Sequence, residues 1–122
     1  MSTTLKHLRE AEYNAAVKLV QTTVVEASKL TRVDTGDAAS NIHPVGSRRE
    51  QAPYRKVEGN IGRGGATSNA KANASKFKPR KDSKFFGVVG TAPHFVYIDE
   101  GTASISPSHA ITNGFRRAAA KL

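Results

Sequence analysis

The chain has 122 residues, a length that fits one domain spanning residues 1–122. It has no cysteine, which excludes disulfides and thiolate metal sites, and no apolar run approaches the roughly 20 residues of a membrane span. The first six residues lack the apolar core of a signal peptide, so we expect a soluble protein made in a cytoplasm. With 19 Lys and Arg against 10 Asp and Glu, the net charge of +9 favours anionic partners, either nucleic acid or an acidic protein surface.

The beginning of the chain predicts one long amphipathic helix from Thr3 to about Leu30. Apolar residues recur there at steps of three and four, and no Pro or Gly interrupts them. At 1.5 Å per residue this helix would be about 40 Å long. That length is large for so small a domain, so we expect the helix to lie across a sheet or against a neighbouring subunit.

A second, short helix is predicted over residues 37–40, where Asp34 and Thr35 are placed to cap its first free N–H groups. Gly36 fits a first helical turn poorly, so we expect it to serve a close approach of the backbone. Residues 41–45 then predict a strand, and Pro44 places that strand at a sheet edge or at its own end.

Residues 46–83 differ in character from both ends of the chain. They hold many basic residues, several glycines and few large apolar groups, so little offsets the entropy lost on ordering. We interpret them as a basic, flexible loop or arm, with a short helix over residues 68–77 as an open alternative. Long loops of this kind are usually functional. The side chains expected to contact DNA or an acidic partner are Arg48, Arg49, Arg55, Lys56, Arg63, Lys71, Lys76, Lys78, Arg80 and Lys81.

Regular structure is predicted again from residue 85. Residues 85–90 indicate a strand, and residues 95–99 fit either a strand or a short helix. A last helix is predicted from about residue 109 to 122, with an apolar face made of Ile111, Phe115, Ala118, Ala119 and Leu122. The resulting fold class is α+β: a small, mainly antiparallel sheet packed against a long N-terminal helix and a C-terminal helix, with a long basic loop.

No pattern in the chain indicates a catalytic, cofactor or metal site. The histidines lack ligand spacing, and the adjacent carboxylates Asp99 and Glu100 would point to opposite faces of a strand. The glycine-rich residues 59–65 lack the Gly-Lys-Ser/Thr ending of a phosphate-binding loop. We therefore expect a protein that is not an enzyme and needs no cofactor.

Two short motifs carry most of the specific information. The first is Val33-Asp34-Thr35-Gly36, after the long helix; the second is Phe95-Val96-Tyr97-Ile98-Asp99-Glu100-Gly101-Thr102, before the last helix. In this order, with the surrounding elements, they resemble the tail-completion and minor tail proteins of long-tailed bacteriophages, the family that includes the lambda minor tail protein Z. The resemblance covers residues 3–45 and 84–122 and leaves out the basic middle segment.

The resemblance implies a structural virion protein of the tail or neck, assembled in the host cytoplasm. Such proteins form rings, commonly six-fold, that complete the tail and join it to the head connector. Implied neighbours are a head connector or stopper protein, a tail tube or tail terminator protein, and packaged DNA through non-specific contacts. The alternative from charge alone is a basic nucleic-acid-binding protein that is not part of a virion.

The motif residues predict a structural role. A Thr hydroxyl and a Glu carboxylate can satisfy free backbone N–H groups, and glycine permits close approach. We expect the two motifs to meet and to fix the long helix to the sheet; two independent turns are the alternative. The residues concerned are Val33, Asp34, Thr35, Gly36, Tyr97, Glu100, Gly101 and Thr102. Family members usually carry a large apolar residue, and often an Arg, where this chain has Asp37-Ala38-Ala39, so we expect the contacts made there in relatives to be absent from this chain.

Overall fold

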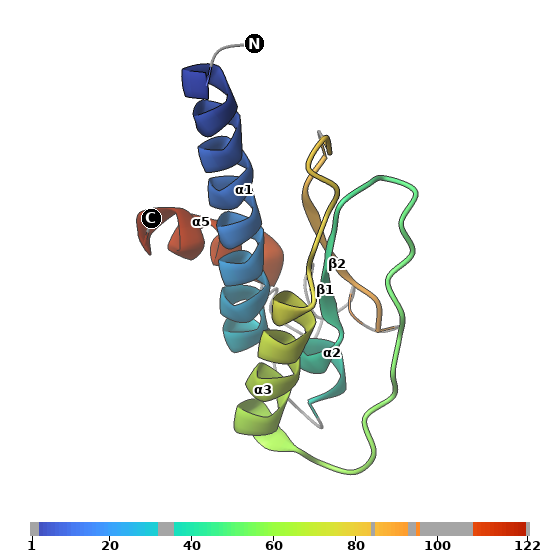
Figure 1. Ribbon diagram of the computed structural model, residues 1–122. Helices are drawn as coiled ribbons and strands as arrows, with labels where there is room; N and C mark the ends of the chain where they lie inside the picture. The colour runs from blue at the N-terminus through green and yellow to red at the C-terminus, as the bar shows by residue number, and fades with distance from the viewer. Residues whose placement is uncertain (1–2, 32–35, 84, 93–94, 96–108, 122) are drawn as a thin grey trace.

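The structure is a computed structural model that describes residues 3–31, 36–83, 85–92, 95 and 109–121. Its elements follow in the order α1 (Thr3–Leu30), α2 (Asp37–Ser40), β1 (Ile42–Val45), α3 (Gly62–Ser75), β2 (Gly87–Gly90) and α5 (Ala110–Lys121) (Figure 1). The predicted α+β class is confirmed, with a long N-terminal helix, a C-terminal helix and a small antiparallel sheet. Among the described helices, even the 28-residue α1 lacks the apolar character of a membrane span.

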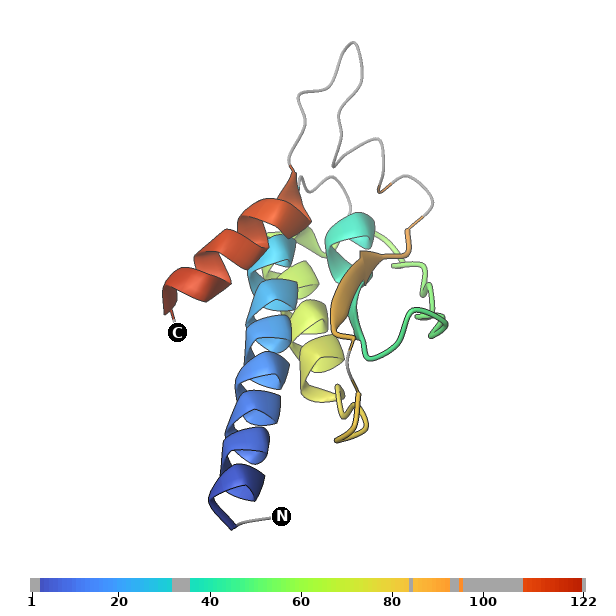
Figure 2. The ribbon, with the colours of Figure 1, turned by 90° about the horizontal axis from the view of Figure 1, so that it is seen from above.

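The second half of α1 forms the centre of the core. Val24 and Ala27 are fully buried there, and Val20 is nearly so. By contrast, residues 9–12 are exposed, and Figure 2 shows the first turns of α1 extending past the other elements. A helix with one buried stripe forms because that stripe packs, since propensity alone rarely stabilises it. The start of α1 is therefore available to a neighbour.

The crossing of α1 and α5 depends on small side chains. A Cβ atom added to Gly114 would lie 2.7 Å from the backbone nitrogen of Ala27, so only glycine permits this approach. Ala110 and Ala118 complete the buried side of α5. The two helices can therefore pack almost backbone against backbone.

This close packing rotates α5 away from the predicted apolar face. The prediction places Phe115 in the core, but this side chain is 49% exposed, because Ala110, Gly114 and Ala118 take the buried side of α5. The prediction is thus wrong for Phe115 and Ala119, which are exposed; Ala118 is buried, Ile111 is partly buried, and Leu122 lies outside the described residues.

The basic middle segment contains the helix α3. The prediction of one loop over residues 46–83 is wrong there, and the alternative of a short helix over residues 68–77 is confirmed for residues 68–75, although α3 begins earlier, at Gly62. Its Ala66, Ala70 and Ala74 are buried. Three alanines at steps of four make an apolar face without large side chains, which let α3 lie close to α1 and α2. The Asn73 amide fixes α3 to the sheet by donating to the carbonyl oxygens of Ser40, at 3.0 Å, and Ile42, at 3.1 Å.

The sheet consists of two described strands, β1 and β2, which pair antiparallel with Ile42 opposite Gly90 and Val45 opposite Gly87. All four residues of β1 are buried. A Cβ atom on Gly90 would come within 2.5 Å of the Phe95 ring, which closes the core at this end. The sheet thus joins the residues just before the middle segment to residues that follow it.

Candidate functional site

Most residues of the two predicted motifs lie outside the described residues. The motif residues outside them are Val33, Asp34, Thr35, Tyr97, Glu100, Gly101 and Thr102. Gly36 is described, at the N-cap of α2 with φ of 98°, and a Cβ atom there would lie 2.7 Å from Cγ1 of Ile61. The expected close approach at Gly36 is therefore present, and its partner is the residue before α3. The meeting of the two motifs stays a prediction.

Asp37 stands where the resemblance led us to expect a large apolar residue, and it anchors the middle segment. Its carboxylate accepts hydrogen bonds from the Tyr54 hydroxyl at 2.6 Å and from the Val57 backbone N–H at 3.0 Å. The hydrogen bond to this carboxylate raises the pKa of Tyr54, because it stabilises the protonated phenol. Asn41 exchanges two hydrogen bonds with the backbone of Arg55, at 2.8 and 3.0 Å. Residues 54–57 are thus joined to Asp37 and Asn41 by hydrogen bonds, and the flexibility of the segment stays a prediction.

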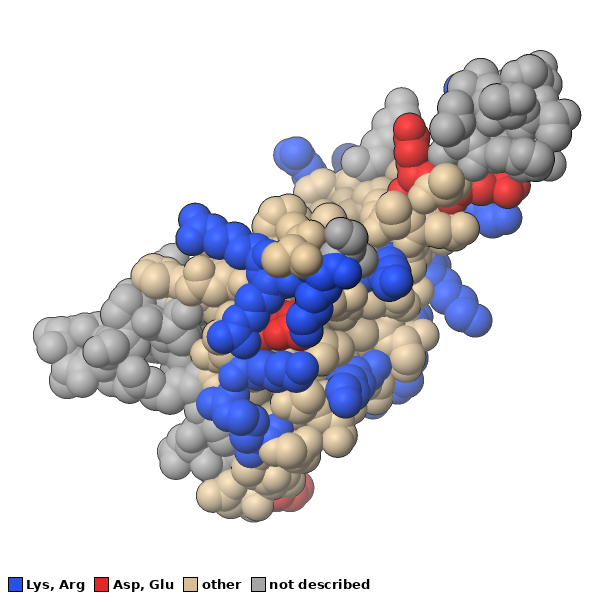
Figure 3. Space-filling view, turned by 90° about the vertical axis from the view of Figure 1, so that its left-hand side faces the viewer, with Lys and Arg blue, Asp and Glu red and all other residues tan. Residues whose placement is uncertain are grey.

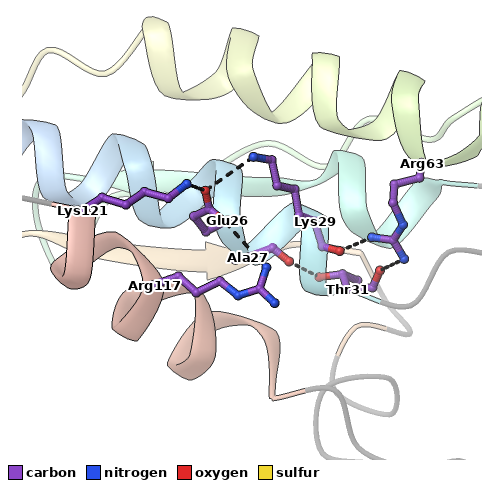
Figure 4. A network of polar contacts seen from close by, with 7 residues as sticks. All are labelled: Glu26, Ala27, Lys29, Thr31, Arg63, Arg117 and Lys121. Carbon is purple, nitrogen blue, oxygen red and sulfur yellow. Dashed lines mark hydrogen bonds and ion pairs between the residues drawn. The ribbon is translucent and has the colours of Figure 1, made fainter.

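All ten cationic side chains predicted to contact a partner are exposed, and they differ in what they contact. Arg63 has a structural task, since its guanidinium donates to the carbonyl oxygens of Lys29 and, at 3.2 Å, Thr31 (Figure 4). These carbonyls end α1 and have no partner within the helix. Arg63 therefore caps α1 from α3.

Three of the other cations surround one hollow of about 290 Å³, which we call the His43 hollow. It lies between β1, residues 50–55 and the end of α3. His43 itself is 8% exposed, and its Nε2 atom is buried without a hydrogen-bond partner. Burial, with the nearby positive charge of Arg55, lowers the pKa of His43 below its ordinary 6.5. The cations on the rim are Arg55, Lys76 and Lys78.

A second hollow of about 480 Å³ lies beside the first and shares Lys78 with it. Its other two cations each contact another side chain. Arg80 pairs with Asp82 at 3.3 Å, and the Arg48 guanidinium stacks over the Phe85 ring at 5.3 Å. The remaining four predicted cations are exposed and line neither of these two hollows: Arg49, Lys56, Lys71 and Lys81.

The structure also shows a cationic cluster that the sequence analysis missed, at the crossing of α1 and α5 (Figure 4). The Glu26 carboxylate is 4% exposed and is contacted by Lys29 at 3.4 Å, by Arg117 at 3.8 Å and by Lys121. The hydrogen bond from Lys121 is the main cause that lowers the pKa of Glu26. Figure 3 views the molecule from the side of α5 and shows many Lys and Arg side chains on this face.

The signal for this cluster was present in the sequence. Glu26 stands on the buried face of α1 between Val24 and Ala27, where a lone acid needs a cation. Arg117 and Lys121 are one turn apart in α5 and so lie on the same side of it. What the sequence could not show was that α5 crosses α1 at this point.

An apolar groove of about 490 Å³ lies between α1, β2 and α5. Leu19 and Val20 of α1, Val88 of β2 and Phe115 of α5 contribute its apolar surface, and Arg116 lies at its rim. It is the most apolar of the hollows described above, and it includes the exposed ring of Phe115. An exposed apolar groove next to charged residues is typical of a protein–protein contact.

Among the described residues, no group of three or more His, Asp or Glu side chains is placed to hold a metal ion. Comparison of the chain with models of known protein families, with curated protein sequences and with solved structures found no match. The candidate sites are therefore the exposed start of α1, the apolar groove, the Glu26 cluster and the His43 hollow.

Proposed function

We propose that this chain is a structural component of the head–tail junction of a tailed bacteriophage. Its copies form a ring that completes the tail and joins it to the head connector. The observation that carries the proposal is the combination of two unlike surfaces on one chain, the apolar groove and the exposed start of α1. The resemblance of the two motifs to tail-completion proteins supports it.

Two unlike surfaces on one chain produce head-to-tail contacts when one of them binds the other on the next copy. Such contacts close into a ring when the rotation between subunits permits it. The occupant we propose for the apolar groove is the start of α1 from the next copy. That segment carries the exposed carboxylates of Glu10 and Glu12 beside the exposed Arg9, and Arg116 lies at the rim of the groove, so a carboxylate of one copy can pair with Arg116 of the next. A helix lying in a groove is a common mode of recognition.

The test is deletion of the gene from the genome that encodes it, followed by electron microscopy of the particles produced. The expected result is filled heads and separate tails, and a wild-type copy should restore joined particles. The variant Phe115→Asp should fail to restore them, because it places a charge in the groove. Val89→Asp is the matched control, since Val89 is also an exposed apolar residue but does not line the groove. Normal joined particles without the gene would overturn the proposal.

A second candidate function is a basic nucleic-acid-binding protein outside any virion. The exposure of all ten predicted cations favours it. Binding to DNA should then weaken steeply with salt, since each neutralised phosphate releases counterions. Strong salt-dependent DNA binding together with normal particles after gene deletion would select this candidate over the first.

A further inference from the structure

We infer that the His43 hollow is a docking pocket for an acidic peptide segment of a protein partner. The inference depends on the proposed function in one respect, namely that the neighbours of the chain at the junction are proteins. It concerns a surface separate from the apolar groove, since the two hollows share no lining residue.

The rim of the hollow provides positive charge that is available to a ligand. Arg55, Lys76 and Lys78 are exposed, and they come from the segment before α3, from its C-cap and from the residues after it. Glu50 also lines the hollow, but its carboxylate accepts the backbone N–H of Gly46 at 3.2 Å. Three cations against one carboxylate leave the rim with net positive charge, and ammonium and guanidinium groups bind a carboxylate ligand through short, charge-assisted hydrogen bonds.

His43 lines the hollow without adding charge to it. One of its ring nitrogens hydrogen-bonds to the backbone of Pro53, and Nε2 is buried without a partner. Burial and the nearby positive charge of Arg55 lower the pKa of His43, so the ring is neutral at pH 7 and the positive charge of the hollow comes from its rim.

The volume and the apolar walls of the hollow also favour a peptide side chain as the ligand. At about 290 Å³ it lies at the lower end of the range for small-ligand pockets, which suits one or two inserted side chains and is too narrow for a nucleic-acid duplex. Pro44, Pro53, Phe77 and Pro79 form walls suited to the methylene part of a Glu side chain.

The pocket is also formed before a ligand arrives. The hydrogen bonds that Asn41 and Asp37 make to residues 54–57 hold one wall, and α3 holds the other. A preformed site loses less conformational entropy when it binds a ligand.

The experiment is a titration of the isotope-labelled chain with a blocked tetraglutamate peptide, followed by NMR. The expected result is that amide signals of His43, Arg55 and Phe77 move, and that the Nε2 signal of His43 moves with them. Parallel titrations use a four-nucleotide oligothymidylate and inorganic phosphate, both of which should bind more weakly.

The double variant Lys76→Glu with Lys78→Glu should weaken peptide binding by about 10-fold or more, because two attractive charges become repulsive. Lys56→Glu with Lys71→Glu is the matched control, with the same charge change at exposed residues outside the hollow. Equal losses in the two double variants would overturn the inference, and so would tighter binding of the oligothymidylate at the same signals.

The two proposals can fail separately. If gene deletion separates heads from tails but the peptide leaves the His43 signals unchanged, the docking pocket is refuted and the proposed function stands. If the peptide binds in the hollow but particles form normally without the gene, the pocket stands and the junction role is refuted.

Discussion

At the crossing of α1 and α5, three cations contact one buried carboxylate, that of Glu26. Around the His43 hollow, three cations lie near Glu50, an exposed carboxylate that accepts one backbone N–H. The first cluster neutralises Glu26 and joins two helices that are far apart in the sequence. The second leaves its positive charge available at the surface. The comparison teaches that the role of a Lys or Arg in this chain depends on whether a buried acid lies within its reach.

The largest expected effect comes from the packing that brings the first cluster together. Gly114→Val should lower the free energy of unfolding by about 3 kcal/mol or more, because the new side chain would overlap the backbone of Ala27. Gly64→Val is the matched control in α3, where an added Cβ meets nothing within 4 Å, and it should change stability by less than about 0.5 kcal/mol. Urea unfolding measures both. Equal effects would mean that the close crossing does not hold the fold.

The next effect separates the two cationic regions directly. Glu26→Gln should cost about 2 kcal/mol, because it removes the charged acceptor of an enclosed hydrogen bond from Lys121. Glu50→Gln, at the exposed rim of the His43 hollow, should cost under about 0.5 kcal/mol. Thermal unfolding of both variants at pH 7 tests the difference. A larger loss of stability for Glu50→Gln than for Glu26→Gln would show that Glu50, and not Glu26, stabilises the fold.

A pH series sharpens the same comparison. The pKa of Glu26 is lowered from its ordinary 4.5 in the folded chain, so its carboxylate stabilises the fold fully above the unfolded-state pKa. This contribution is lost as the pH falls through the folded pKa. The stability difference between wild type and Glu26→Gln should therefore be constant from pH 7 to about 5.5 and shrink below about pH 4.5. A stability difference that grows as the pH falls would contradict a lowered pKa of Glu26.

The smallest expected effect concerns Arg63, which belongs to the middle segment by sequence and to the fold by its contacts. Arg63→Gln should cost about 1 kcal/mol, since the carbonyl oxygens at the end of α1 lose their donors. Lys71→Gln, an exposed cation on the same helix, should change stability by less than about 0.5 kcal/mol. Equal stability of the two variants would show that Arg63 does not cap α1 and that its charge is available to a partner.

The helices at the ends of the chain could be predicted because their patterns are local. The bounds of α1 and α2 coincide with the predicted ranges, and β1 and β2 lie within theirs. The start of α3 and its buried face were not predicted. That face consists of Ala66, Ala70 and Ala74, which carry little of the signal that large apolar residues give. Glycine at 62, 64 and 65 lowered the helical expectation further.

The candidate site was predictable in composition and not in geometry. The sequence correctly placed exposed cations in residues 46–83, but it could not show that Arg55, Lys76 and Lys78 share one hollow while Arg63 turns to α1. Those positions depend on α3 packing and on the hydrogen bonds of Asp37 and Asn41. Such contacts join residues 14 or more positions apart, which periodicity does not report.

Residues 9–12 of α1 are exposed, and their amide exchange reports whether another molecule covers them. Tyr13 fixes α1 to the end of the middle segment, since its hydroxyl donates to the Pro79 carbonyl oxygen at 2.5 Å. At residues 9–12, which lie before it and are exposed, amide hydrogens should exchange rapidly with deuterium in the solitary chain, because helix ends open at little cost. Once another molecule covers those turns, the exchange should slow. Mass spectrometry of this one stretch would then time when the chain is incorporated.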